Sequence, residues 1–490
     1  MPWETVIGLE IHVQLATESK IFSGAGTRFG SAPNSQACAI DLAMPGTLPV
    51  LNRQAVDYAL MFGLAIDADL PETSVFERKN YFYPDLPKGY QTTQLEKPIV
   101  GAGNIPINLP DGTLKNVRIH HAHLEEDAGK SLHEGSFNAA YSGIDLNRAG
   151  TPLIEIVTEP DLSNATEAVV FAKKLHGIVT SLGICDGHMA EGSMRFDVNI
   201  SVRPRGSETL GTRTETKNLN SFKFMEEAIA LEVNRQIDVL EDGGVITQET
   251  RLYNGDTKVA RSMRSKEEAN DYRYFPCPDL LPVTITKAHL QKLRLSLPEL
   301  PDARAERLQQ QFGIAAQEAE IFAYNPALSD YFEVAAKACN DALLAAHWTT
   351  GEVVRRLKTA SLELHDSPVS AAQLSTLLKR VGDQTISGKI AKQVFEAMWL
   401  GEGDADQIIS ERGFKQVSDS SALEKIVGEV LAKNPEMVRD YVGTEESRRK
   451  KKLGGFMGQI MQASRGQANP QQVNRILVEK LNEAIHSASG

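Results

Sequence analysis

The clearest pattern near the N-terminus is a strict alternation of polar and apolar residues from Gly8 to Leu15. A β-strand points successive side chains to opposite faces, so Glu10, His12 and Gln14 share one face and the apolar residues take the other. A carboxylate and an imidazole on a rigid strand can bind a hard metal ion. An edge strand whose polar face meets water has the same pattern, so this segment alone does not distinguish a metal site from a solvated strand.

A second alternating strand is predicted from Met194 to Arg203. Its apolar residues face the core, and Arg195, Asp197 and Asn199 share the opposite face. Guanidinium, carboxylate and amide groups together suit a ligand that carries phosphate and a metal ion. An ordinary solvated sheet face is the alternative.

Two further segments supply carboxylates. Glu155 interrupts an apolar strand at 153–157, where a charge is costly unless it is paired or bound to metal. The segment from Val117 to Asp127 ends in an acidic cluster that includes Glu125, although such turns are often simply solvated. Oxygen donors with one nitrogen favour Mg²⁺ or Mn²⁺ over zinc. The predicted metal-binding and catalytic residues are Glu10, His12, Glu125 and Glu155.

A third strand, predicted at 212–217, leads to a helix N-terminus. Ser221 is a good N-cap, and an apolar stripe with helical spacing follows from Phe222. Lys217 and Asn218 then lie beside the helix N-terminus, where anions bind favourably. Capping the helix needs only Ser221, so a purely structural role for Lys217 and Asn218 is the alternative. The predicted nucleotide-binding residues are Arg195, Asp197, Asn199, Lys217 and Asn218.

Residues 79–90 form an aromatic, proline-rich loop that contains Lys79, Tyr81 and Lys88. Loops of this composition line channels or binding grooves, but they also pack on their own domain. The chain has no P-loop, no dinucleotide-binding glycine motif and no G-x-S-x-G motif. If the protein uses ATP, its site is therefore of another type.

The amino-acid composition changes twice along the chain. A length of 490 residues predicts more than one domain. Residues 1–293 are rich in Gly, Pro and short alternating segments, which predicts a mainly β domain. Residues 294–405 are rich in Ala, Leu, Glu and Gln, which predicts a helical domain, and 406–490 predict a small helical tail domain. The expected fold class is α+β.

Composition excludes several classes of protein. Hydrophobic residues make up 41% and charged residues 24%, which is typical of soluble globular proteins. No apolar run approaches the length of a membrane span and no signal peptide is evident, so we expect a cytoplasmic protein without membrane contact. The four cysteines are isolated, which argues against a disulfide framework or a zinc site.

The net charge of −12 argues against a protein that coats nucleic acid, but one segment reverses the sign. Between Tyr441 and Arg475 there are seven Lys or Arg and two Glu, and five of the basic residues are consecutive. This local excess favours RNA binding over a solvated charge run. The predicted RNA-binding residues are Arg448, Arg449, Lys450, Lys451 and Lys452.

Several long motifs together resemble one family, the B subunit of the heterotrimeric aspartyl/glutamyl-tRNA(Asn/Gln) amidotransferase. The matching segments are Gly8–Leu15, Met44–Asn52, Lys79–Gln91, Asn147–Glu155, Glu215–Ser221, Asp271–Pro276 and Pro298–Asp302. The C-terminal stretch from Gly458 to Pro470 resembles the family's C-terminal module. The resemblance covers essentially the whole chain.

The resemblance implies a cradle-shaped first domain, a helical domain and a helical tail that contacts tRNA. It implies that ATP, with Mg²⁺, phosphorylates the side-chain carboxylate of Glu on mischarged tRNA(Gln) or of Asp on mischarged tRNA(Asn). Ammonia from a glutaminase A subunit then displaces the phosphate, and a small C subunit holds the complex together. Which tRNA is physiological, and whether an aminoacyl-tRNA synthetase docks, stay open.

The same resemblance implies that Lys79, Tyr81 and Lys88, with Glu125, gate the ammonia channel. One departure concerns metal binding, because some relatives carry a C-x-x-C pair where this chain has Cys38 and Asp41. We therefore expect no zinc. The competing interpretation is a non-catalytic tRNA-binding scaffold, which would not need a carboxylate inside an apolar strand.

Overall fold

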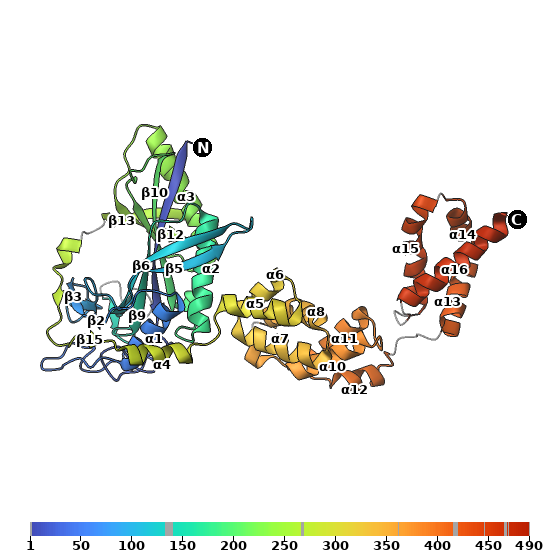
Figure 1. Cartoon of the computed structure of the whole chain (residues 1–490), viewed down its shortest axis with the longest axis horizontal. Coiled ribbons are helices and arrows are strands. Elements are labelled where there is room, and N and C mark those ends of the chain that lie inside the picture. Colours follow the sequence, from blue (N-terminus) through green and yellow to red (C-terminus); the bar gives the residue numbers. More distant parts are fainter. Residues whose placement is uncertain are drawn as a thin grey trace. The chain divides into compact units, whose positions relative to one another are not determined.

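The computed structural model describes residues 2–132, 141–265, 269–360, 362–414, 420–444, 446–464, 468 and 470–489. The chain divides into two compact units, Met1–Pro301 and Asp302–Gly490 (Figure 1). Strands dominate the first unit and helices make up the second, which confirms the α+β class. The three-domain division at 293 and 405 stays a prediction.

An eight-stranded sheet forms the centre of the first unit, in the order β13-β12-β11-β10-β1-β9-β6-β5. Its strands are β1 (Trp3–Gln14), β5 (Gly103–Asn108), β6 (Leu114–Glu126), β9 (Pro152–Thr158), β10 (Met194–Pro204), β11 (Thr214–Lys217), β12 (Glu249–Asn254) and β13 (Val259–Ser265). All neighbouring pairs are antiparallel except β11 and β12. The strands that carry the predicted site residues are therefore adjacent.

Short strands complete the first unit. They are β2 (Thr73–Ser74), β3 (Glu77–Asn80), β4 (Tyr90–Thr93), β7 (Lys130–Leu132), β8 (Gly143–Asp145), β14 (Phe275–Pro276) and β15 (Val283–Thr284). Strand β3 pairs with both β4 and β14. This pairing brings the aromatic loop that follows β3 next to a segment about two hundred residues later in the chain.

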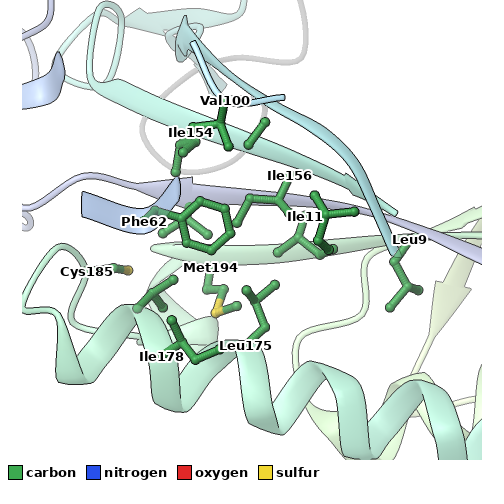
Figure 2. Packing of buried hydrophobic residues seen from close by; sticks show 14 of the residues in the cluster. Leu9, Ile11, Phe62, Val100, Ile154, Ile156, Leu175, Ile178, Cys185 and Met194 are labelled. Carbon is green, nitrogen blue, oxygen red and sulfur yellow. The ribbon is translucent and has the colours of Figure 1, made fainter. Parts of the chain in front are cut away.

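Helices cover one face of the large sheet (Figure 1). They are α1 (Arg53–Ala65), α2 (Ala165–Ser181) and α3 (Phe222–Glu241), and α4 (Lys287–Ser296) packs on α1. Figure 2 shows Leu175 and Ile178 of α2 with Phe62 of α1 and with Ile11 and Ile156 of the sheet. Each fully buried side chain of this size contributes about 1.5–3 kcal/mol. Burying this apolar face turns the polar residues of the same strands to the opposite face.

Helix α3 begins where the sequence predicts, because the Ser221 hydroxyl accepts a hydrogen bond from the Phe224 amide at 3.1 Å. Its inner face also carries polar residues that the apolar stripe did not predict. Glu232, only 1% exposed, accepts a hydrogen bond from the Thr214 hydroxyl at 2.7 Å. Buried Gln236 donates to the Ile200 carbonyl at 3.0 Å. These contacts tie α3 to β10 and β11.

The second unit is helical. It contains α5 (Pro301–Phe312), α6 (Ala316–Ala323), α7 (Pro326–Cys339), α8 (Ala342–Trp348), a π-helical turn (Thr349–Val353), α9 (Val354–Ala360), α10 (Ala371–Gly382), α11 (Gly388–Trp399), α12 (Ala405–Glu411), α13 (Ser420–Lys433), α14 (Pro435–Val442), α15 (Glu446–Ala463) and α16 (Pro470–Ser489). Helices α5–α12 enclose one apolar cluster and α13–α16 enclose another. Within the described ranges, every helix is too short or too polar to cross a bilayer.

We predict that Glu232→Gln destabilises the first unit by about 3 kcal/mol, because it removes the charge that pairs with Arg235 and Arg251. Burial opposes ionisation of Glu232, but hydrogen bonds from Arg235 and Thr214 outweigh it and hold the pKa below its usual range. The wild-type advantage is therefore present at neutral pH and shrinks as the pH falls below about 4.

Urea unfolding of the first unit, followed by Trp3 fluorescence in a Trp348→Phe, Trp399→Phe background, measures this difference, since the chain has three tryptophans. Glu226→Gln, at an exposed position of the same helix, is the matched control. Equal stability of the Glu232 and Glu226 variants would contradict the prediction.

Candidate active site on the polar face of the sheet

One row of directly paired residues crosses three neighbouring strands on the face opposite the helices. Glu155 of β9 pairs with His123 of β6 on one side and with His12 of β1 on the other. Paired residues point to the same face, so Glu155 lies between two imidazoles. The Nε2 atoms of His12 and His123 are both 3.3 Å from Glu155 Oε2. The strand register therefore builds a carboxylate–histidine cluster.

Glu125 completes this cluster, because it follows His123 by two residues on the same strand face. Its Oε1 atom is 3.6 Å from His12 Nε2. Ligand atoms of His12, Glu125 and Glu155 all lie within 4.8 Å of one another. We call these three residues the histidine group. Carboxylate oxygens with one imidazole fit Mg²⁺ or Mn²⁺.

The carboxylates of this cluster favour positive charge on the two neighbouring imidazoles, His12 and His123. Burial opposes the charge on His12, but the carboxylates of Glu155 and Glu125 outweigh it and raise the pKa of the imidazole to about 9. His123 shows the same balance, with its pKa raised to about 10. Burial opposes ionisation of Glu155 too, but the two imidazoles hold its pKa well below its usual range. At neutral pH both imidazoles are therefore protonated, and a metal ion that binds His12 would displace its proton.

A second group of carboxylates lies along the same face. Glu10 pairs with Asp197 across β1 and β10, and Asn199 pairs with Glu215 across β10 and β11. Ligand atoms of Glu10, Asp197 and Glu215 lie within 4.8 Å of one another. We call these three residues the acidic group. The structure thus groups Glu10 with Asp197 and Glu215, whereas the sequence had assigned it to the same set as His12.

Polar side chains hold the acidic group in place. Asn199 Nδ2 donates to Glu10 Oε1 at 2.9 Å. Lys217 forms ion pairs with Asp197 and, at 3.3 Å, with Glu215. Burial opposes the charge on Lys217, but Asp197 and Glu215 outweigh it and raise the pKa of its ammonium group. The Thr250 hydroxyl donates to Glu215 at 2.7 Å.

Sequence reasoning missed Glu215 and His123. The sequence pattern pointed to both residues. Glu215 lies two residues before Lys217, and His123 lies two residues before Glu125, on the same strand in each case. A period of two places such pairs on one face. Thr250 carried no signal, because it reaches the site only through the parallel pairing of β11 with β12.

Arg195 lies beside the histidine group, in register with His12. Its Nη2 atom is 2.8 Å from Asp127 Oδ2, and Gln14 Nε2 donates to the same oxygen at 3.1 Å. Burial raises the pKa of Asp127, but Arg195 and Arg148 outweigh it and keep the pKa low. Arg195 is thus held on a buried carboxylate while part of its side chain stays accessible.

Asn218 stabilises the turn that follows β11. It adopts a left-handed conformation with a φ of 70°, and its side chain donates to the Tyr253 carbonyl at 2.9 Å. This contact holds the turn between β11 and α3 against β12. Its predicted contact with a nucleotide stays a prediction.

The aromatic loop packs against the acidic end of β6. Lys88 forms an ion pair with Glu126, and its ammonium lies 5.0 Å from the centre of the Tyr90 ring. Lys88 and Glu126 line a cavity of about 230 Å³. Burial and the charges of Glu125 and Glu126 raise the pKa of Tyr81. The loop therefore lies close to the histidine group, while its gating of ammonia stays a prediction.

Asp41, the residue for which we expected no role in zinc binding, is held by two neighbouring groups. Its Oδ2 atom is 3.3 Å from Nζ of the fully buried Lys20 and accepts a hydrogen bond from the Cys38 amide at 2.9 Å. Lys20 also donates to the Leu146 carbonyl at 3.1 Å. An internal ion pair thus anchors this loop.

The basic run lies in α15. Lys452 Nζ is 2.5 Å from Asp440, and Arg449 donates to the Thr444 carbonyl at 2.9 Å. The predicted contacts of the Arg448, Lys450 and Lys451 side chains lie outside what the structure describes.

Comparison with known proteins decides the family. Residues 5–291 match the family model described as "GatB/GatE catalytic domain", and residues 330–481 match the one described as "GatB domain". The chain belongs to the GatB family. This confirms the resemblance read from the motifs, and a catalytic-domain match confirms the expectation of an enzyme.

Relatives of this GatB-family chain match it along its length. The B subunit of an aspartyl/glutamyl-tRNA(Asn/Gln) amidotransferase from Saccharophagus degradans is 67% identical over 98% of this chain and 100% of its own length. The protein of the same name from Teredinibacter turnerae is 64% identical, with the same coverage. The one from Pseudomonas aeruginosa PAO1 is 59% identical, again with 98% and 100% coverage.

We predict that the histidine and acidic groups bind separate divalent cations. Glu155→Gln and Glu215→Gln should each weaken Mn²⁺ binding at one site by at least tenfold, because each removes a charged ligand. Equilibrium titration with Mn²⁺, followed by electron paramagnetic resonance, measures both affinities. Glu226→Gln, at an exposed position of α3 outside both groups, is the control. Unchanged Mn²⁺ affinity in both site variants would contradict the assignment.

Proposed function

We propose that this chain is the catalytic subunit for ATP-dependent amidation of Glu on mischarged tRNA(Gln), of Asp on mischarged tRNA(Asn), or of both. The observation that carries the proposal is Glu155 held between His12 and His123, next to the acidic group on the same sheet face. Family membership supports the tRNA-dependent amidotransferase class.

Phosphoryl transfer from ATP needs a bound divalent cation. A carboxylate is a poor electrophile, and phosphorylation gives it a leaving group. Mg²⁺ ions, when bound, neutralise the charge that develops on the transferred phosphoryl group. The donor sets fit this role: His12, Glu125 and Glu155 would hold one ion, and Glu10, Asp197 and Glu215 the other. ATP and Mg²⁺ are thus the proposed cosubstrate and cofactor.

The chain's own side chains orient the reacting groups. Lys217, Arg195 and Asn199 present cationic or amide donors along the same strand face, which suits phosphate oxygens. Fixed donors on strands cost little reorganisation during the reaction. The Thr250 hydroxyl keeps one Glu215 oxygen engaged, so the other faces Lys217.

Ammonia must arrive unprotonated and shielded from water. The cavity beside Lys88 and Glu126 lies at the same end of β6 as Glu125, which supports Lys88 as a gate residue. Lys79 and Tyr81, the other proposed gate residues, are outside the lining of this cavity. A glutaminase A subunit would supply the ammonia and a small C subunit would join the two, in the cytoplasm. An aminoacyl-tRNA synthetase is a further candidate partner.

We predict that Glu10→Ala and His12→Ala each lower amide formation by at least a hundredfold in the assembled complex, because each removes a ligand of the proposed cations. Glutamine hydrolysis by the partner subunit should stay measurable. Thin-layer analysis of the aminoacyl group released from tRNA reports the amide. His188→Ala, at an exposed histidine outside the site, is the control. Wild-type amidation in both site variants would refute the assignment.

Deleting the tail distinguishes the hypothesis of a catalytic protein from that of a tRNA-binding scaffold. ATP hydrolysis that depends on mischarged tRNA should persist without residues 406–490 when the tRNA concentration is high. A scaffold would lose it.

We further predict that replacing Arg448 to Lys452 by Gln weakens tRNA binding and flattens its dependence on salt, by roughly 0.9 in the log–log slope for each phosphate that the protein no longer neutralises. Filter binding between 50 and 200 mM salt would measure the slope. Lys389→Gln, at an exposed site of α11, is the control for a charge change elsewhere. An unchanged slope would place the tRNA contact on another surface.

A further inference from the structure

Three histidines of β6 lead from the surface of the sheet to the histidine group. They are His120, which is exposed, His121, which is half-buried, and His123, which is buried. Nδ1 of His120 lies 2.7 Å from Nδ1 of His121, and Nε2 of His121 lies 3.1 Å from Nδ1 of His123. We call these residues the imidazole chain. The proposed reaction so far assigns no role to its first two members.

An irregularity in the pairing of β6 with β9 explains how neighbouring histidines meet. Ile119 pairs with Thr158 and His121 pairs with Val157, so His120 is the extra residue between the two pairs. Regular alternation would turn His120 and His121 to opposite faces. An extra residue of this kind is a β-bulge, which re-aims side chains and is frequent beside active sites. Here the two rings contact each other edge to face, with centres 4.9 Å apart.

The middle ring of the imidazole chain is neutral. His121 stacks on His123, with ring centres 5.2 Å apart and planes at 17°. Burial and the charges of His123 and His120 lower the pKa of His121 to about 4. A neutral imidazole has one N–H group and one acceptor nitrogen. His121 can therefore bond to both neighbouring rings at the same time.

The last ring of the imidazole chain holds two carboxylates of the histidine group. His123 Nε2 is 3.3 Å from Glu155 Oε2 and 3.7 Å from Glu125 Oε2. Rotation of this ring by about 180° around its Cβ–Cγ bond, between the two broad minima of that torsion, would turn carbon atoms toward the carboxylates. The same rotation would break the hydrogen bond to His121. That bond therefore favours the orientation in which Nε2 faces the carboxylates.

The orientation of His123 matters because Glu125 and Glu155 are proposed cation ligands. Hydrogen bonds that reach ligand groups from outside orient those groups and tune the affinity for metal. The hydrogen bonds of His121 run to the two neighbouring imidazoles, so it would act on the ligands through His123.

We propose that His121 is a positioning residue of the phosphorylation site: its hydrogen bond to Nδ1 of His123 fixes the ring orientation that holds Glu155 and Glu125 ready for the cation. The inference rests on the proposed function and deepens it, because it adds a residue outside the ligand set. His120 supports the far nitrogen of His121 in the same way. Its effect is smaller, because it is exposed and water can replace it.

Two substitutions at one position separate hydrogen bonding from packing. His121→Phe keeps a flat ring against His123 but has no polar atom, whereas His121→Gln keeps a polar group that can bond to Nδ1. In the full-length chain, His121→Phe should weaken Mn²⁺ binding at the histidine group by about threefold or more and leave the acidic group unchanged. Electron paramagnetic resonance measures both affinities, and Glu155→Gln identifies the one that belongs to the histidine group.

The same variants are then assayed in the assembled complex. His121→Phe should lower kcat for amidation by about fivefold or more without changing KM for mischarged tRNA, because it disturbs the reaction centre and not tRNA binding. His121→Gln should retain most of the wild-type Mn²⁺ affinity and kcat. His347→Phe, at an exposed histidine of the second unit, is the matched control.

Three results would overturn the proposal. The first is wild-type Mn²⁺ affinity and kcat in His121→Phe. The second is an equal loss in both His121 variants, because packing would then be responsible. The third is a higher KM for tRNA with unchanged kcat, which would make His121 a direct substrate contact. A wild-type complex that forms no amide would remove the proposed function, whereas the Mn²⁺ affinities of the full-length chain would still decide the role of His121.

Discussion

The position of one carboxylate on a central strand organises this face of the sheet. Glu155 lies inside a segment whose neighbours Ile154 and Ile156 are fully buried, so its charge needs compensation. Compensation comes from both sides, because the register places His12 on one neighbouring strand and His123 on the other. A slip of one residue in either pairing would turn these imidazoles to the helix-covered face and leave the carboxylate without them.

The two faces of the sheet support each other through β11. This strand is four residues long, and it presents Glu215 and Lys217 to the site. Its opposite face presents Thr214 to Glu232 and Gln236 of α3. A short strand has few ladder hydrogen bonds of its own, so buried contacts behind it determine how accurately it holds its site residues. An apolar contact in place of the hydrogen bond between Thr214 and Glu232 would still pack against β11, but it would not fix the orientation of the strand.

The aromatic segments show how a distant part of the chain completes a surface. The loop after β3 and the segment before β14 meet because β3 pairs with β14, and Asn80 then holds the Tyr272–Arg273 backbone. The result sets exposed rings and cations beside acidic strand ends. Acidic and basic side chains are thus kept on neighbouring elements.

Local periodicity determined much of this protein. Alternation predicted β1 and β10 and the face of each of their side chains, and an apolar run predicted β9. Ser221 with the following apolar stripe predicted the start of α3. These features depend on neighbours within a few residues, where backbone geometry leaves little choice. The motifs also identified the family.

Only the tertiary structure decided which side chains meet. The order and register of the strands separated Glu10 from the histidine group, brought in Glu215 and His123, and added Thr250 through a parallel pair. The buried Glu232 network and the Lys20–Asp41 pair were equally hidden, since their partners come from other elements. Periodicity specifies the face of a strand, whereas its neighbours depend on packing of the whole sheet, to which distant residues contribute as much as adjacent ones.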